Sequence, residues 1–206
     1  MSMLEVDTKG LRELQKGKPL TFIINELCQN VFDEQSTKCI IDIVYNSNQK
    51  LISVRVEDDN PEGFKDITHA YTLFRHTEKR LNPEQRGRFN LAEKQIAVCS
   101  EKTTIKTTKG TIILDTINDK RIELDEYRKE GSEILVILKG TKKQYDEMIE
   151  HTKKIICPKD IEYIVNGNKM PKTDIYKSFK AKLLTELLKN GIMVKDTRKT
   201  SVNLVE

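Results

Sequence analysis

Tryptophan is absent from the 206-residue sequence, and no apolar run reaches the length of about 18 residues that a membrane-spanning helix needs. Residues 1–17 mix charged and polar side chains and lack the apolar stretch of a secretory signal. These absences argue against membrane and secreted proteins. They predict a cytoplasmic protein with no membrane partner.

The common phosphate-binding and metal-binding motifs are also missing. G-x-x-x-x-G-K-[ST] does not occur, no G-x-G-x-x-G follows a strand-like run, and no C-x-x-C pair is present. The cysteines are widely spaced, and three of them lie in apolar runs where small core residues are expected. Their spacing therefore supports neither a zinc site nor a redox motif. They are Cys28, Cys39, Cys99 and Cys157.

Charge is plentiful but uneven. Charged residues make up 33% of the sequence, and the net charge is +4. Residues 172–206 contain eight Lys/Arg and four Asp/Glu, so this segment alone accounts for the excess of four. Such a segment is typical of a solvated, lysine-rich face, and contact with nucleic acid is the alternative.

Hydrophobic periodicity predicts a mixed fold. Apolar residues recur at helical spacing from Leu20 to Val31, inside a predicted helix over 18–34 with Pro19 in its first turn. Ile- and Val-rich runs separated by turn residues predict strands, the first two forming an antiparallel hairpin. Further helices are predicted over 65–74, 90–100 and 144–155, and strands over 39–45, 51–57, 103–108, 111–116, 134–138 and 161–166.

This order of elements predicts an α+β fold, a two-layer α/β sandwich in which helices cover one face of a mixed, mostly antiparallel sheet. Residues 1–170 are expected to form this domain. Pro171 marks the predicted boundary. Residues 171–206 contain too little apolar mass for a core of their own, and we expect them to begin a second, incomplete domain.

The predicted helix over 18–34 carries a polar stripe beside its apolar one. Glu26, Asn30 and Asp33 follow each other at i, i+4 and i+7. An amide oxygen is a suitable ligand for magnesium, and a neighbouring carboxylate can deprotonate a water molecule. By itself this spacing is more typical of a solvated helix face.

Three later segments add polar groups in a fixed order. Residues 56–64 (V-E-D-D-N-P-E-G-F) run from a strand into an acidic turn, where a carboxylate can accept a hydrogen bond from an exocyclic amine. Residues 86–94 offer a glycine and free N–H groups at a helix start, with Asn90 as the expected cap and Glu93 as its capping-box partner. Gly131-Ser132 places a hydroxyl just before a late strand.

Together, in this order, the four segments resemble the GHKL ATPase superfamily of the gyrase B subunit, the heat-shock chaperone of ninety kilodaltons, histidine kinases and MutL. The likeness is nearer to the branch of MutL and the topoisomerase VI B subunit, and it covers roughly residues 20–166. It implies a Bergerat-type ATP-binding fold with ATP and Mg2+ as cofactors.

The resemblance also implies roles for individual residues. Glu26 would be the general base, Asn30 the magnesium ligand, and Asp58 the acceptor of the adenine amino group. The acidic box is one residue longer than the family pattern, so counting back from Gly63 selects Asp59 instead. Residues 75–88 would form the ATP lid. Further implied nucleotide contacts are Asp33, Gly63, Lys79, Gly87, Arg88, Phe89, Asn90, Leu91, Ala92 and Ser132.

The implied activity is magnesium-dependent ATP binding with slow hydrolysis, which drives lid closure and formation of a homodimer. A DNA or protein client would bind through a C-terminal region missing from the sequence. Two alternatives stay open. The chain is a nucleotide-binding or partner-binding module without hydrolysis, or a basic nucleic-acid-binding protein.

Overall fold

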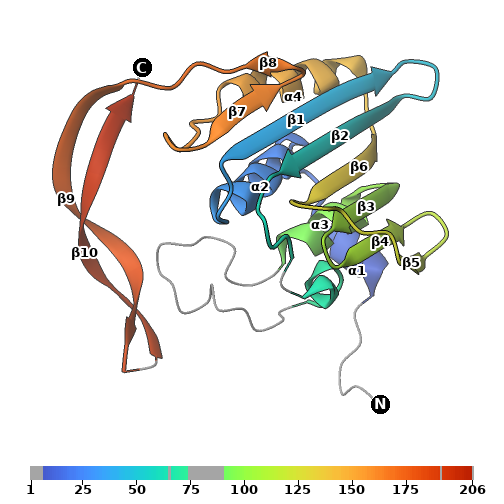
Figure 1. The fold of residues 1–206 in the computed structure, drawn as a ribbon, viewed down its shortest axis with the longest axis horizontal. Helices are drawn as coiled ribbons and strands as arrows, with labels where there is room; N and C mark the ends of the chain where they lie inside the picture. Colours follow the sequence, from blue (N-terminus) through green and yellow to red (C-terminus); the bar gives the residue numbers. More distant parts are fainter. Residues whose placement is uncertain (1–6, 65, 74–90, 191, 206) are drawn as a thin grey trace.

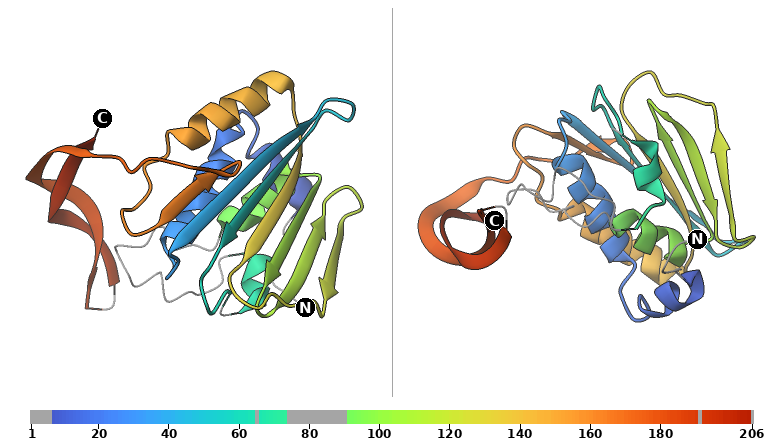
Figure 2. Two further views of the ribbon diagram at one scale, coloured as in Figure 1. Left: turned by 45° about the horizontal axis from the view of Figure 1, so that its top comes forward. Right: turned by 90° about the horizontal axis from the view of Figure 1, so that it is seen from below.

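In a computed structural model, which describes residues 7–64, 66–73, 91–190 and 192–205, helices cover one face of an eight-stranded sheet (Figures 1 and 2). The helices are α1 (Thr8–Glu13), α2 (Thr21–Phe32), α3 (Ala92–Cys99) and α4 (Lys142–Lys153), with a 3-10 helix η1 (Ile67–Ala70). The strands of the sheet are β1 (Lys38–Asn46), β2 (Leu51–Asp58), β3 (Lys102–Thr107), β4 (Gly110–Asp115), β5 (Lys120–Leu124), β6 (Glu133–Lys139), β7 (Glu162–Val165) and β8 (Asn168–Lys169).

The strand order is β5-β4-β3-β6-β2-β1-β7-β8. All neighbours pair antiparallel except β1 and β7, which are parallel. The hairpin of β1 and β2 has the predicted pairing. The predicted α+β class, a mostly antiparallel sheet with helices on one face, is confirmed.

Side-chain alternation along β2 decides which groups reach the helices. Ile52, Val54 and Val56 are buried on the helix-covered face, where the apolar stripe of α2 packs with them in one core. Because successive side chains of a strand point to opposite faces, Glu57 lies on the open face and Asp58 on the helix-covered face. The apolar pattern of β2 thus sets the orientation of its acidic end.

Several local predictions were wrong. Helix α2 begins at Thr21 with Leu20 as its N-cap, so Pro19 precedes the first turn. The N-cap of α3 is Leu91, with no side-chain cap hydrogen bond, whereas the expected cap Asn90 lies outside the described residues. Among the described residues of the segment over 65–74 the only helix is the short η1, and neither α1 nor β5 was predicted. No helix of the described residues is long and apolar enough to cross a membrane.

Two long strands, β9 (Ile175–Lys189) and β10 (Ile192–Val205), form a separate two-stranded hairpin. It lies beside the sheet and curls along its length (Figures 1 and 2). The sequence predicted only short strand-like or helical pieces here. Continuous antiparallel pairing extends them because nearly every residue of β10 has a partner in β9.

Candidate functional site

The polar stripe of α2 meets the start of α3. Asn30 Nδ2 donates a hydrogen bond of 3.0 Å to Glu93 Oε1. An ionised carboxylate can only accept hydrogen bonds, so Asn30 must present its nitrogen to Glu93. The bond fixes the plane of the amide and leaves the Asn30 oxygen for another partner. Sequence reasoning missed this role of Glu93.

Glu26 lies one helical turn before Asn30 and is partly buried. Burial raises the pKa of its carboxyl, nearby Glu93 raises it further, and Lys18 opposes this shift. A carboxylate with a raised pKa is a better proton acceptor near neutral pH. The environment of Glu26 therefore suits the role of a base.

A buried lysine connects α3 with η1. Lys94 is 5% exposed, its Nζ donates to the carbonyl oxygen of His69, and the same atom lies 3.4 Å from Glu93 Oε2. Burial lowers the pKa of Lys94, while Glu93 opposes that shift. These contacts hold the start of α3, including Leu91 and Ala92, next to α2 and η1. Five other predicted contacts lie outside the described residues: Lys79, Gly87, Arg88, Phe89 and Asn90.

Asp58 ends β2 on the helix-covered face. Its Oδ1 accepts hydrogen bonds from the backbone N–H groups of Asn60 (2.9 Å) and Ser132 (3.2 Å). Burial raises the pKa of Asp58 to about 6, although these two hydrogen bonds lower it and nearby Glu34 raises it. The contact from Ser132 to Asp58 comes from its backbone N–H.

Asp59 has hydrogen-bond partners different from those of Asp58. Its carboxylate accepts hydrogen bonds from Thr37 N (2.8 Å), Lys38 N (2.9 Å) and Thr37 Oγ1 (2.5 Å) at the start of β1. Burial alone would raise the pKa of Asp59, but these hydrogen bonds outweigh it and hold the pKa below its ordinary value. Both Asp59 oxygens are thus occupied, which leaves Asp58 as the better candidate for a ligand.

Two glycines allow close packing of the backbone near the end of β2. Gly131 has φ +68°, and a Cβ there would lie 1.9 Å from the Asp58 carbonyl oxygen. Gly63 has φ +58°, and a Cβ there would lie 2.8 Å from Thr108 Oγ1. Both backbones adopt the left-handed region that favours glycine. The turn after β2 and the loop before β6 therefore pack closer than any side chain would permit.

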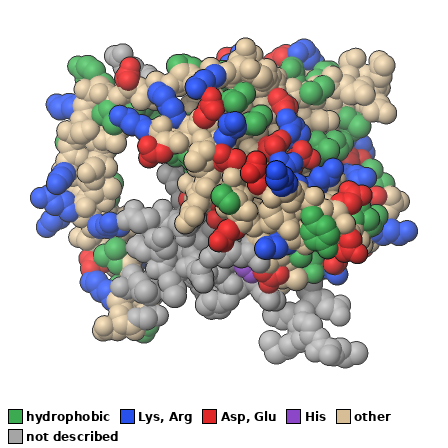
Figure 3. All heavy atoms as spheres, viewed as in Figure 1, with side chains coloured by type: hydrophobic (Ala, Val, Ile, Leu, Met, Phe, Trp, Pro, Cys, Tyr) green, Lys and Arg blue, Asp and Glu red, His purple; other side chains and the backbone are tan. Residues whose placement is uncertain are grey.

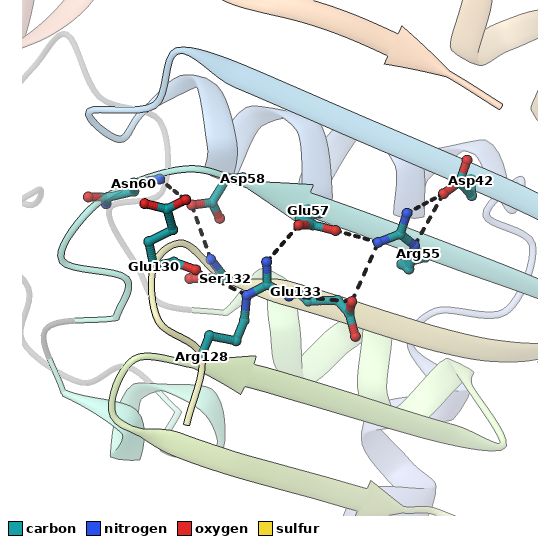
Figure 4. Close-up of polar contacts among 9 residues, drawn as sticks. All are labelled: Asp42, Arg55, Glu57, Asp58, Asn60, Arg128, Glu130, Ser132 and Glu133. Carbon is teal, nitrogen blue, oxygen red and sulfur yellow. Dashed lines mark hydrogen bonds and ion pairs between the residues drawn. The ribbon is translucent and has the colours of Figure 1, made fainter. Parts of the chain in front are cut away.

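An ion network lies on the open face of the sheet, beside Asp58 and Ser132 (Figure 4). Glu57 and Glu133 are opposite each other in the β2–β6 register, an arrangement that destabilises a sheet unless a cation intervenes. Arg55 and Arg128 each contact both carboxylates, and Arg55 also pairs with Asp42 at 2.5 Å.

Arg128 also orients the loop before β6. Its guanidinium lies 2.6 Å from Glu57 Oε1, and its Nε donates to the carbonyl oxygen of Glu130 at 3.2 Å. Glu57 precedes Asp58, and Glu130 is two residues before Ser132. The side chain thus fixes the two backbone segments that meet at Asp58. No motif in the sequence revealed this network, because its members alternate with core residues of β2 and β6.

Asp33 is the C-cap of α2, one turn after Asn30. It lines a cavity of about 490 Å3 near the C-terminal end of α2, together with Gln29, Cys157 and Asn203. None of Glu26, Asn30 and Asp58 lines this cavity. Glu26 and Asn30 lie one turn apart on α2, and Asp58 meets Ser132 at the end of β2.

The donor set available to a metal ion is small. Among the described residues, no group of three or more His, Cys, Asp or Glu side chains is arranged to hold a metal. The Asn30 oxygen is a hard ligand of the kind that Mg2+ accepts. Because Mg2+ usually keeps several waters and binds nucleotide phosphates, one amide oxygen from the protein fits such an ion.

Comparison with known proteins shows a likeness of fold. The search against protein families and the search of curated proteins found no match. Among solved structures, the ATPase and transducer domains of DNA topoisomerase II from Balamuthia mandrillaris match with TM-score 0.50 and 14% identity, over 74% of this chain and 48% of that one. The ATPase region of Saccharomyces cerevisiae topoisomerase II matches with TM-score 0.48 and 14% identity, over 73% and 48%.

The same yeast region bound to ICRF-187 (dexrazoxane) gives TM-score 0.49, also at 14% identity. The chain spans about half the length of these structures. At this identity the likeness concerns the fold alone, which resembles that of the topoisomerase II ATPase and transducer domains. The narrower likeness to MutL and the topoisomerase VI B subunit stays a prediction.

Proposed function

We propose that the chain binds ATP together with Mg2+ and hydrolyses it slowly. The fold supports this, because the similar Balamuthia structure is an ATPase domain. The observation that carries the proposal is the environment of Asp58. This carboxyl sits at a strand end, with Oδ1 held by two backbone N–H groups and Asp59 committed elsewhere.

Asp58 would recognise adenine. With Oδ1 oriented by Asn60 and Ser132, Oδ2 can accept a hydrogen bond from the exocyclic amino group of the base. Gly131 lets the loop before β6 approach the Asp58 backbone closely, which helps to hold this carboxyl in one position. A positioned acceptor favours adenine over guanine, which presents a carbonyl oxygen at the corresponding place.

Glu26 and Asn30 would act at the phosphates. The Asn30 amide, oriented by Glu93, would offer its oxygen to Mg2+, which when bound neutralises charge on the phosphate oxygens. Glu26 would accept a proton from the attacking water, a task that suits its raised pKa. Leu91 and Ala92, at the start of α3, would contribute N–H groups to the phosphates.

The remaining parts of the proposal concern closure of an ATP lid and formation of a dimer. Residues 75–88 would act as the ATP lid, and Lys79, Gly87, Arg88, Phe89 and Asn90 would add nucleotide contacts. Lid closure would create a surface for a second copy, and hydrolysis would reset it. A DNA or protein client, and the finer kinship with MutL and the topoisomerase VI B subunit, are part of the same proposal.

Calorimetry with a non-hydrolysable ATP analogue, with and without Mg2+, tests the binding. Asp58→Asn should weaken binding by roughly 10- to 100-fold, since a charged hydrogen bond contributes about 1.5–3 kcal/mol. Asp59→Asn is the matched control and should bind nearly as tightly as the unmutated chain. Equal binding by Asp58→Asn, or no binding by the unmutated chain, contradicts the proposal.

Turnover is tested separately. Glu26→Gln should retain binding of the analogue and lose ATP hydrolysis, because glutamine cannot accept the proton. If the unmutated chain binds ATP but releases no phosphate, the chain is a non-hydrolysing nucleotide-binding module instead.

A further inference from the structure

The hairpin of β9 and β10 concentrates lysines on one face. Lys182 lies directly opposite Lys199 in the antiparallel register, and Lys180 lies opposite Ser201. Because side chains alternate along a strand and opposite residues share a face, these three lysines project from the same side. All three are exposed. We call Lys180, Lys182 and Lys199 the lysine cluster.

The other face of the hairpin mixes apolar side chains with charged ones such as Lys177, Asp196 and Arg198. It carries Phe179 opposite Val202 and Leu187 opposite Val194, and three of these four residues are partly buried. The hairpin curls (Figure 2), and Lys and Arg side chains project from its outer edge (Figure 3). The lysine cluster therefore belongs to the more exposed of the two faces.

The register of the cluster is unfavourable without a partner. Like charges directly opposite each other on neighbouring strands destabilise the pair. Among the described residues of this face the acidic one is Glu186, which lies opposite Lys195, away from the cluster. A polyanion across Lys182 and Lys199 would remove the repulsion. The lysine cluster is therefore complementary in charge to a ligand that carries several anionic groups in a row.

We propose that the lysine cluster binds the phosphate backbone of a nucleic acid, independently of base sequence. A strand rises about 3.4 Å per residue, so Lys180 and Lys182 are about 7 Å apart along β9, or two nucleotide steps of one DNA strand. A two-stranded ribbon is also narrow enough to enter the major groove. A nucleic acid can follow the curled hairpin, whereas a planar anionic membrane touches only part of it.

The test measures binding of a fluorescent 20-base-pair DNA duplex to the full chain by anisotropy, between 50 and 200 mM salt. Each neutralised phosphate contributes about −0.9 to the slope of log K against log salt. Three contacts contribute about −2.7, which is about a 40-fold loss of affinity over this range. The triple variant Lys180→Gln, Lys182→Gln and Lys199→Gln should lose this part of the slope.

The matched control removes three exposed lysines from α4 through Lys142→Gln, Lys143→Gln and Lys153→Gln. It has the same net charge as the first variant and should keep the slope of the unmutated chain. Equal losses in both variants would show a general charge effect and overturn the proposal. So would an absence of DNA binding, or capture of phosphatidylserine vesicles in preference to DNA.

A gain-of-function variant covers the case in which the triple variant is unstable. Ser201 is exposed on the same face, opposite Lys180. Ser201→Lys extends the cluster by one charge and should steepen the slope by about 0.9. An unchanged slope in this variant, with circular dichroism like that of the unmutated chain, contradicts the proposal.

Discussion

Replacing Asp58 by asparagine should stabilise the nucleotide-free protein while weakening its binding of nucleotide. Burial raises the pKa of Asp58 from 3.8 to about 6, so its ionised form is disfavoured in the folded state. A difference of about two units corresponds to about 3 kcal/mol, since one unit is about 1.4 kcal/mol. Asparagine carries no charge, and its oxygen can still accept from Asn60 and Ser132.

The sign of the pH dependence follows from the same shift. Protonated Asp58 favours the folded state, so its contribution is complete below a pH of about 4 and is lost as the pH rises through about 6. Asp58→Asn removes this loss. The variant should therefore be more stable than the unmutated chain at pH 7 by up to about 3 kcal/mol, or roughly 6–12 °C in Tm. The two should converge near pH 4.

Urea unfolding of both proteins without nucleotide, at several pH values from 4.5 to 8, measures this difference. Asp59→Asn is the control, and its effect on stability should be opposite to that of Asp58→Asn. The reason is that hydrogen bonds from Thr37 and Lys38 hold the pKa of Asp59 below its ordinary value. That variant should be less stable than the unmutated chain at pH 7, and the gap should close as the pH falls. The reasoning is refuted if Asp58→Asn is destabilised at pH 7, or if its stability difference does not change with pH.

Three further substitutions probe the surroundings of the site. Arg128→Ala should lower the free energy of unfolding by about 1–3 kcal/mol and weaken binding of the ATP analogue, because two carboxylates lose a partner. Arg128→Lys keeps the charge but not the forked guanidinium group. In calorimetry it should recover only part of the affinity. Gly131→Ala should destabilise the fold by roughly 3 kcal/mol or more in thermal unfolding, since its Cβ would collide with the Asp58 carbonyl oxygen. An unchanged Tm would contradict the close approach of Gly131 to Asp58. Thr141→Ala removes the capping box of α4 and should cost about 1 kcal/mol in urea unfolding while binding of the analogue stays unchanged.

The core elements could be predicted because their signals are local and repeated. The apolar stripe from Ile23 to Val31 and the alternation of β2 each depend on neighbouring residues alone. Strand β5 was missed because its residues are largely exposed and show no alternation; its pairing with β4 defines it. Local patterns therefore indicate the sandwich but not its edge.

The site was harder to predict, because its contacts join distant segments. Glu93 stands three residues after Asn90, as a capping-box partner would, yet its hydrogen bond is with Asn30, 63 positions earlier. Counting from the strand selected Asp58, whereas counting back from Gly63 selected Asp59. The difference between them comes from Thr37, which precedes β1 and bonds to Asp59. Such assignments need the tertiary structure.

The hydrogen bond from Lys94 to the His69 carbonyl oxygen also has a consequence for how this chain tolerates insertions. It joins the segments on either side of residues 74–90, so both ends of the intervening connection are already fixed by the rest of the fold. The entropy of closing a loop grows only slowly with its length, by about 0.6 kcal/mol for each doubling. We therefore expect insertions between His69 and Lys94 to leave the stability of the sheet and its helices almost unchanged.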